Sequence, residues 1–182
     1  MMLMRDVWFV VALIWIVMAF RTKRTVRRVR GPWPVVFLVG VIAVGVIDAI
    51  AGPGGHRARW IVSSPVSVVA TTMVFLGAIF AIWARLTIGS NWSGTVSHKE
   101  SHELVVSGPY RFARHPIYTG LFFMALGTTI EYAEFDGFVF LAVAIIVFAF
   151  KIRVEEGLMM SLFPDQYPAY RRRVKAIIPF VL

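Results

Sequence analysis

The chain has 182 residues, of which 58% are apolar, and a formal net charge of +9 from 19 Lys and Arg against 10 Asp and Glu. This apolar share is above that of a soluble domain, and the charges cluster between long apolar runs, as in a membrane protein. The chain contains no cysteine, which excludes a disulfide framework, a thiolate nucleophile and a Cys-based metal site. Anionic lipid head groups explain the basic excess better than a nucleic acid does.

Three apolar runs in the first half of the chain predict membrane-spanning helices. Val7 to Phe20 is short, but basic residues follow it rather than precede it, which favours a span that includes Met1 to Met4 over a signal peptide. The second run, Pro34 to Ala51, holds one charge, Asp48, which we interpret as the outer end of its helix. The third run, Ile61 to Ala84, carries no charge and is long enough to cross the bilayer.

Two shorter apolar runs follow, Ile117 to Ile130 and Gly137 to Phe150, and the acidic stretch Glu131–Asp136 separates them. This pattern predicts a short helical hairpin. Two consecutive acidic residues, Glu155 and Glu156, are unfavourable at a helix C-terminus, so we expect the last helix to continue to Phe163. The sequence therefore predicts an all-α integral membrane protein with about five transmembrane helices and a C-terminal helical extension.

The distribution of basic residues predicts the orientation of these helices. The first loop, Arg21 to Arg30, holds six basic residues. If this loop is cytoplasmic, 16 basic residues lie inside and three outside, which agrees with the positive-inside rule. We therefore expect the N-terminus outside, the C-terminus and its helical extension inside, and a single membrane domain over residues 1–182 with three N-terminal spans in residues 1–84.

Residues 89 to 116 interrupt the membrane pattern. Gly108-Pro109 indicates a turn, and His115-Pro116 indicates a helix start, because proline suits the first helical position. With Arg111 and Arg114 just upstream, this helix N-terminus is suited to an anion such as a carboxylate or phosphate, and the ring of His115 is expected to stay neutral. The alternative is that the two arginines contact lipid phosphates while His115 caps its own helix.

A second polar cluster, Lys151 to Glu156, lies at the predicted cytoplasmic end of the fifth helix. Lys151 and Glu155 are four residues apart and share a helix face. A carboxylate there could bind an amine or ribose hydroxyls, while the cation holds an anionic substrate. On spacing alone, a snorkelling lysine with a surface ion pair is the favoured explanation. The spacing of His, Asp and Glu along the chain suggests no metal site.

Several linked motifs resemble a known family. They are the segment from His102 to Gly120, Glu155-Glu156, Leu162-Phe163, Tyr167-x-x-Tyr170 and Ile178-Pro179-Phe180, with Gly89-Ser-Asn-Trp-Ser before them. Together they are similar to the isoprenylcysteine carboxyl methyltransferases, and the related phospholipid N-methyltransferases share a looser version. The resemblance covers residues 85–182, which it identifies as a methyltransferase-like cofactor-binding half.

The resemblance implies transfer of a methyl group from S-adenosylmethionine to a lipidic or prenylated acceptor, most often a carboxylate. Its cofactor contacts fall on His102, Glu103, Leu104, Val105, Tyr110, His115, Pro116, Ile117, Tyr118 and Glu155, with Arg114 beside the helix start as a further contact for the carboxylate of the cofactor. The substrate-orienting cation falls on Lys151, and the adjacent Arg153 is a second candidate. A carboxylate acceptor needs no general base, whereas an amine or hydroxyl does, and Glu156 or His115 is the candidate.

Departures from the family pattern leave the acceptor open. Lys151 stands where Arg is common, which gives up bidentate carboxylate recognition, and Pro164 stands where eukaryotic relatives often have Gly. The chain also lacks their additional N-terminal spans, which suggests a compact prokaryotic member in the plasma membrane with its active site facing the cytoplasm. Expected partners are a lipophilic or prenylated substrate and membrane lipids, without metal or nucleic acid.

Two other functions are compatible with the sequence. One is a membrane NADPH-dependent sterol- or enone-type reductase, whose C-terminal half is similar. The pair Glu155-Glu156 counts against it, because no additional basic site is evident for the 2′-phosphate. The other is a non-catalytic membrane scaffold that keeps the fold without the chemistry.

Overall fold

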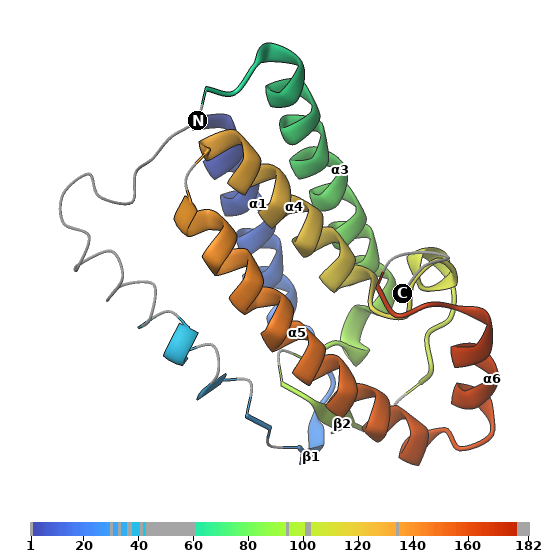
Figure 1. The fold of residues 1–182 in the computed structure, drawn as a ribbon. Helices are drawn as coiled ribbons and strands as arrows, with labels where there is room; N and C mark the ends of the chain where they lie inside the picture. Colours follow the sequence, from blue (N-terminus) through green and yellow to red (C-terminus); the bar gives the residue numbers. More distant parts are fainter. Residues whose placement is uncertain are drawn as a thin grey trace.

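The computed structural model describes residues 2–29, 31–32, 34–35, 38–40, 42, 61–93, 95–100, 103–133 and 135–177. Within these residues the fold is mostly helical (Figure 1). The elements are α1 (Met2–Ala19), β1 (Thr25–Arg28), α3 (Ser64–Ile88), η1 (Gly89–Asn91), β2 (Ser97–Lys99), η2 (Gly108–Arg111), α4 (Pro116–Tyr132), α5 (Phe135–Leu162) and α6 (Gln166–Arg173). The long helices α1, α3, α4 and α5 form a bundle, and the short strands and α6 gather at one end of it (Figure 1).

The helix bounds follow the sequence signals closely. α3 begins at Ser64, three residues later than predicted, because Pro65 fits the first turn. It ends at Ile88, four residues beyond the predicted run, and is capped by Gly89, whose φ of 54° favours glycine. Among the described residues, two helical segments are long and apolar enough to cross a membrane, Ser64–Asn91 and Asp136–Leu162. The second predicted span, Pro34 to Ala51, lies largely outside the described residues, and so does Asp48.

Small residues bring α3 and α4 into close contact. A Cβ added to Gly77 would lie 2.6 Å from the carbonyl oxygen of Gly120, and one added to Gly127 would lie 2.5 Å from that of Ala70. The two contacts are seven residues apart on both helices, which is the repeat of packed helices that share one seam. Small side chains allow helix backbones to approach closely in a membrane. This contact fixes the position of the start of α4.

The helices α4 and α5 form the predicted hairpin. Ala133 ends α4 in the left-handed conformation, with φ of 54°, and its backbone N–H donates to Thr129 O. Across the turn, Thr129 Oγ1 donates to Gly137 O at 3.3 Å. Of the two helices in this hairpin, which was predicted to be short, α4 is short, with 17 residues. α5 is longer, with 28 residues, and ends at Leu162, one residue before its predicted end. A separate short helix, α6, follows it.

A short antiparallel ribbon of β1 and β2 departs from the all-α prediction. Thr25 pairs with Lys99 and Arg28 with Ser97, and Val29 N donates to Val96 O at 2.8 Å beyond the ribbon. The basic loop after α1 is therefore fixed against the segment that follows η1. The sequence of β1 shows no alternation of apolar and polar residues, so it gave no signal for a strand. The strand forms because its backbone pairs with residues far along the chain.

Arg85, counted among the cytoplasmic basic residues, is fully buried. Its guanidinium donates to Met18 O at 2.9 Å and to Gly89 O at 2.8 Å, and it stacks 4.3 Å from the ring centroid of Trp92. These bonds satisfy carbonyls near the C-terminal ends of α1 and α3. Arg85 thus joins the two helices at the end of the bundle that carries the ribbon.

Candidate active site

A cavity of about 340 Å³ lies at this end of the bundle. Its walls come from α1, the end of α3, the η1–β2 segment, η2 with the segment before it, the start of α4, the second half of α5, and α6. It is lined by Trp15, Ile88, Asn91, Trp92, Ser93, Thr95, Val96, Ser97, Glu103, Leu104, Val105, Tyr110, Arg114, His115, Ile117, Tyr118, Leu121, Phe148, Lys151, Glu155, Leu158, Met159, Tyr167 and Tyr170. The two polar clusters found in the sequence therefore meet in one place.

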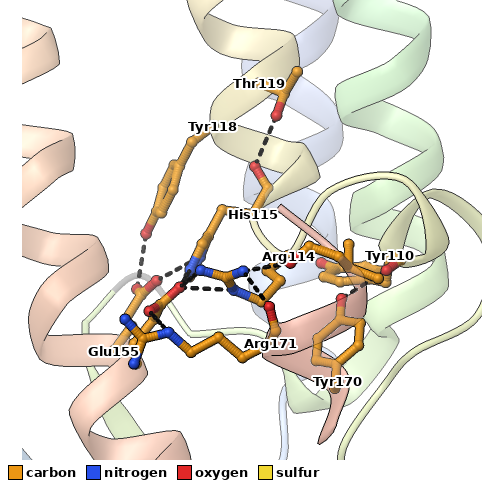
Figure 2. A network of polar contacts seen from close by, with 10 residues as sticks. Tyr110, Arg114, His115, Tyr118, Thr119, Glu155, Tyr170 and Arg171 are labelled. Carbon is orange, nitrogen blue, oxygen red and sulfur yellow. Dashed lines mark hydrogen bonds and ion pairs between the residues drawn. The ribbon is translucent and has the colours of Figure 1, made fainter. Parts of the chain in front are cut away.

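His115 lies between two carboxylates. It precedes the first residue of α4, as predicted, and its ring faces Glu155 and Glu156 of α5 (Figure 2). Nδ1 is 3.4 Å from Glu155 Oε2, and Nε2 is 3.4 Å from Glu156 Oε1. Burial lowers the pKa of His115, but the hydrogen bonds and charges of the two carboxylates outweigh it, so the pKa is raised above 6.5. The pKa thus shifts in the direction opposite to the one expected, because α5 supplies two negative charges to this helix start.

Glu155 is the centre of the contacts inside the cavity. Tyr118 Oη donates to its Oε1 at 2.8 Å, and Lys151 Nζ lies 4.0 Å from the same oxygen. The side chains of Lys151 and Glu155 are only 15% and 21% exposed. The predicted i, i+4 pair therefore forms, and it lines the cavity instead of a surface.

An aromatic stack supports this pair. The ring of Tyr118 stacks on that of His115, with centroids 5.7 Å apart, and on that of Phe148, with centroids 4.9 Å apart. Lys151 Nζ lies 5.3 Å from the Tyr118 ring centroid, within the range of a cation–π contact. The cavity thus presents aromatic faces, a carboxylate and a cation side by side, which suits a ligand that carries both signs of charge.

Glu156 faces away from the cavity. Its Oε1 accepts from Arg114 Nε at 2.8 Å and from Arg114 Nη2 at 2.6 Å, and its Oε2 lies 3.3 Å from Arg171 Nε of α6 (Figure 2). Arg153 is exposed and does not line the cavity. Of the three α5 residues expected to act on the acceptor, Lys151 alone lines the cavity, because successive helix residues point about 100° apart. His115, the other candidate base, lines the cavity as well.

Most of the expected cofactor contacts do line the cavity. These are Glu103, Leu104, Val105, Tyr110, Arg114, His115, Ile117, Tyr118 and Glu155. Pro116 is buried and begins α4 without lining the cavity, and His102 lies outside the described residues. Within the described part of the chain, no three His, Asp or Glu side chains lie close enough together to hold a metal ion.

Sequence reasoning assigned no individual role to several lining residues. Trp15 looks like any apolar residue of a span, so the sequence offers no signal for it. Asn91 and Trp92 belong to the motif that begins at Gly89, and Tyr167 and Tyr170 to a second motif, but neither motif indicated which side chains reach the cavity. Their positions depend on how η1 and α6 fold back over the bundle.

Tyr167 and Tyr170 of α6 form a buried wall of the cavity. Tyr170 Oη donates to Tyr110 O at 2.6 Å, and Tyr167 and Tyr170 are only 2% and 4% exposed. Burial raises the pKa of Tyr110, Tyr167 and Tyr170 above the ordinary tyrosine range. These phenols therefore stay protonated at physiological pH, and that of Tyr170 donates to Tyr110 O.

Residues 69–161 match the isoprenylcysteine carboxyl methyltransferase (ICMT) family model. The chain is 30% identical over 139 residues to protein-S-isoprenylcysteine O-methyltransferase B of Arabidopsis thaliana, and the match covers 75% of this chain and 68% of the relative. This chain belongs to the ICMT family. The solved structure of a eukaryotic intramembrane Ras methyltransferase ICMT matches 80% of the chain and 52% of its own length, with a TM-score of 0.61 and 28% identity.

This chain matches only part of the length of some ICMT relatives. The protein-S-isoprenylcysteine O-methyltransferase of Xenopus laevis is 33% identical over 120 residues, which is 63% of this chain but only 41% of the relative. The match to the family model nevertheless contains both polar clusters, from His115 to Glu156. The resemblance of these motifs to the ICMT family is confirmed, and the relatives named here are methyltransferases rather than reductases.

Proposed function

We propose that this protein is an integral membrane methyltransferase that uses S-adenosylmethionine to methylate a carboxylate on a lipidic or prenylated acceptor. The observation that carries the proposal is the meeting of His115 and Tyr118 with Lys151 and Glu155 in one cavity at the end of the bundle. Membership of the ICMT family supports the reaction class. The reductase and scaffold alternatives have no comparable support.

The donor set of the cavity fits the parts of the cofactor. The carboxylate of Glu155 is suited to an ammonium group or to ribose hydroxyls, and the start of α4 is suited to a carboxylate. The ring faces of Tyr118 and Tyr110 are suited to a sulfonium cation or to adenine. When bound, the cofactor supplies an electrophilic methyl group. The further proposed contacts, Glu103, Leu104, Val105 and Ile117, add mostly apolar lining.

Lys151 is the residue that we assign to the acceptor. Its ammonium group lies beside Glu155 and Tyr118 within the cavity, where it can orient an acceptor carboxylate. A carboxylate is already a nucleophile and needs no general base. A reaction without a general base is consistent with the position of Glu156, because its carboxylate is already paired with Arg114 and Arg171. The chain would then act by aligning the two reactants and by excluding water.

The hydrocarbon part of the acceptor has a place beside this cavity. A second cavity of about 160 Å³ lies between α1, α4 and α5, and its walls are almost wholly apolar. Leu121 and Phe148 line both cavities. An amphiphilic acceptor can therefore keep its chain among apolar residues while its head group reaches Lys151.

We further propose that the site faces the cytoplasm. β1, which belongs to the basic first loop, and α6, which carries three arginines, lie at the same end of the bundle (Figure 1). Tyrosines of α6 line the cavity, and cytoplasmic loops carry the basic excess in membrane proteins. A water-soluble cofactor would reach the cavity from this side.

The test is methyl transfer by the purified full chain in detergent. With S-adenosylmethionine labelled in its methyl group, the protein is expected to label an S-farnesyl cysteine derivative with a free carboxylate, but not the same compound as its amide. Glu155→Gln is expected to lower this labelling. The control is Glu100→Gln, which changes an exposed acidic residue outside the cavity and should leave the labelling unchanged. Thermal protection by NADPH and not by S-adenosylmethionine would support the reductase instead, and a folded protein that binds neither would support the scaffold.

A further inference from the structure

The guanidinium of Arg114 is largely used by the protein itself. Nε and Nη2 donate to Glu156 Oε1, and Nη1 donates to Arg171 O at 3.3 Å and to Val174 O. A guanidinium has five N–H groups, and these bonds use four of them. Although Arg114 borders the cavity, its charge is therefore directed at Glu156 and at the end of α6 rather than at a ligand.

The same segment is bound to the start of α4 by backbone pairs. Arg114 N donates to Lys175 O at 2.8 Å and His115 N to Ala176 O at 2.9 Å. One turn further along α4, Thr119 Oγ1 donates to Ile177 O at 2.7 Å. Residues 174–177 thus run beside the first turn of α4. Two of their partners, Arg114 and His115, line the cavity, and the third, Thr119, follows the lining residue Tyr118.

α6 needs these bonds to keep its position. It is eight residues long, and isolated helices of this length are unstable in water. Its last turn carries three consecutive arginines, which do not favour burial. Its two tyrosines nevertheless form a buried wall of the cavity. The chain must therefore hold α6 in place through its contacts with the rest of the fold, which include the bond of Tyr170 to Tyr110 O and the bonds of residues 174–177 described above.

We propose that Arg114 and Glu156 are positioning residues that clasp residues 174–177 against α4 and so hold the tyrosine wall of α6 over the bound cofactor. This proposal rests on the proposed function for its cofactor readout, but its structural part does not. It also gives the two adjacent acids of α5 separate tasks. Glu155 faces the cavity, whereas Glu156 faces the clasp (Figure 2).

The experiment measures hydrogen exchange and cofactor release in the full chain in detergent. Arg114→Gln is expected to speed amide exchange in residues 166–177 while leaving the peptides of α3 unchanged. It is also expected to speed dissociation of S-adenosylhomocysteine at least tenfold. Arg172→Gln, an exposed arginine of the same helix, is the matched control and should change neither. If Arg114→Gln unfolds the whole chain, Arg114→Met/Glu156→Leu removes the buried charges together, and the same local exchange is expected.

An engineered disulfide can distinguish two roles of Arg114, namely holding residues 174–177 in place and binding the cofactor directly. Ala113 and Lys175 are partners in a parallel bridge, a spacing that a disulfide can span, and the natural chain has no cysteine. In the Arg114→Gln background, oxidation of Ala113→Cys/Lys175→Cys should restore slow exchange and slow cofactor release, and reduction should reverse both.

Two results would overturn the clasp. One is faster cofactor release in Arg114→Gln with unchanged exchange in residues 166–177, and the other is a disulfide that restores protection but not affinity. Either would make Arg114 a direct ligand. If the unaltered protein binds no S-adenosylhomocysteine, the proposed function fails, while the exchange comparison still decides whether the clasp exists.

Discussion

The ring of His115, at the start of α4, lies 3.4 Å from the carboxylate of Glu155, near the end of α5. This contact joins the two polar clusters of the sequence into one site. It also makes the hairpin of α4 and α5 functional, because the two clusters meet only if the hairpin closes and α5 extends beyond it. The following predictions test the contacts around this pair.

Glu155→Gln should weaken binding of S-adenosylhomocysteine by about 10-fold to 100-fold, because it removes a negative charge beside His115, Lys151 and Tyr118. Isothermal calorimetry in detergent measures the effect. Tyr118→Phe removes one hydrogen bond to the same oxygen and should cost less, about 10-fold at most. Equal affinities of Glu155→Gln and the unaltered protein would exclude Glu155 as a cofactor contact.

The contribution of His115 to stability should depend on pH. Glu155 and Glu156 raise its pKa in the folded protein above the unfolded value of 6.5. The stabilisation is therefore fully present below pH 6.5 and is lost as the pH rises through the folded pKa. Unfolding of the unaltered protein and of His115→Gln, followed by tryptophan fluorescence from about pH 5.5 to 9, should show a difference that shrinks as the pH rises. A difference that grows would contradict this sign.

Lys151→Met should lower kcat/KM for a carboxylate acceptor by about 10-fold to 100-fold and change the Kd of the cofactor by less than about threefold. The reason is that we assign Lys151 to the acceptor and Glu155 to the cofactor. Lys151→Arg keeps the charge and offers bidentate binding, so it should retain activity. A loss of cofactor affinity that equals the loss of kcat/KM would move Lys151 to the cofactor site.

Gly77→Ala should destabilise the fold by about 1–3 kcal/mol, because the added methyl group overpacks the contact of α3 with α4. The new Cβ would lie 2.6 Å from Gly120 O. Gly157→Ala is the matched control, since a Cβ there meets nothing within 4 Å, and it should be neutral or stabilise α5 by about 0.5–1 kcal/mol. Thermal unfolding in detergent compares the two variants, and equal melting temperatures would rule out the tight seam.

The sequence predicts the helices well because their signals are local. Apolar runs, His115-Pro116 at the start of α4 and Gly89 at the end of α3 set the bounds within a few residues. The pair Lys151 and Glu155 was also predictable from spacing, although the spacing could not tell a cavity from a surface. The resemblance to the ICMT family supplied the chemistry that the spacing left open.

Contacts between residues that are far apart in the chain could not be predicted from the sequence. The pairing of β1 with β2 depends on backbone bonds between segments about 70 residues apart. The bond of Arg114 to Glu156 depends on the way α5 turns one acid toward the cavity and the next away from it. For the same reason the proton preference of His115 was predicted wrongly, since the opposing charges come from another helix.

The matched family region, residues 69–161, excludes three aromatic residues that line the cavity, Trp15, Tyr167 and Tyr170. The chemistry-bearing pair His115 and Glu155 lies inside that region, whereas part of the enclosure is built by α1 and α6 outside it. The family match alone therefore does not account for the whole wall of the cavity. The shape of the cavity depends on two helices that flank the matched region, as well as on the helices within it.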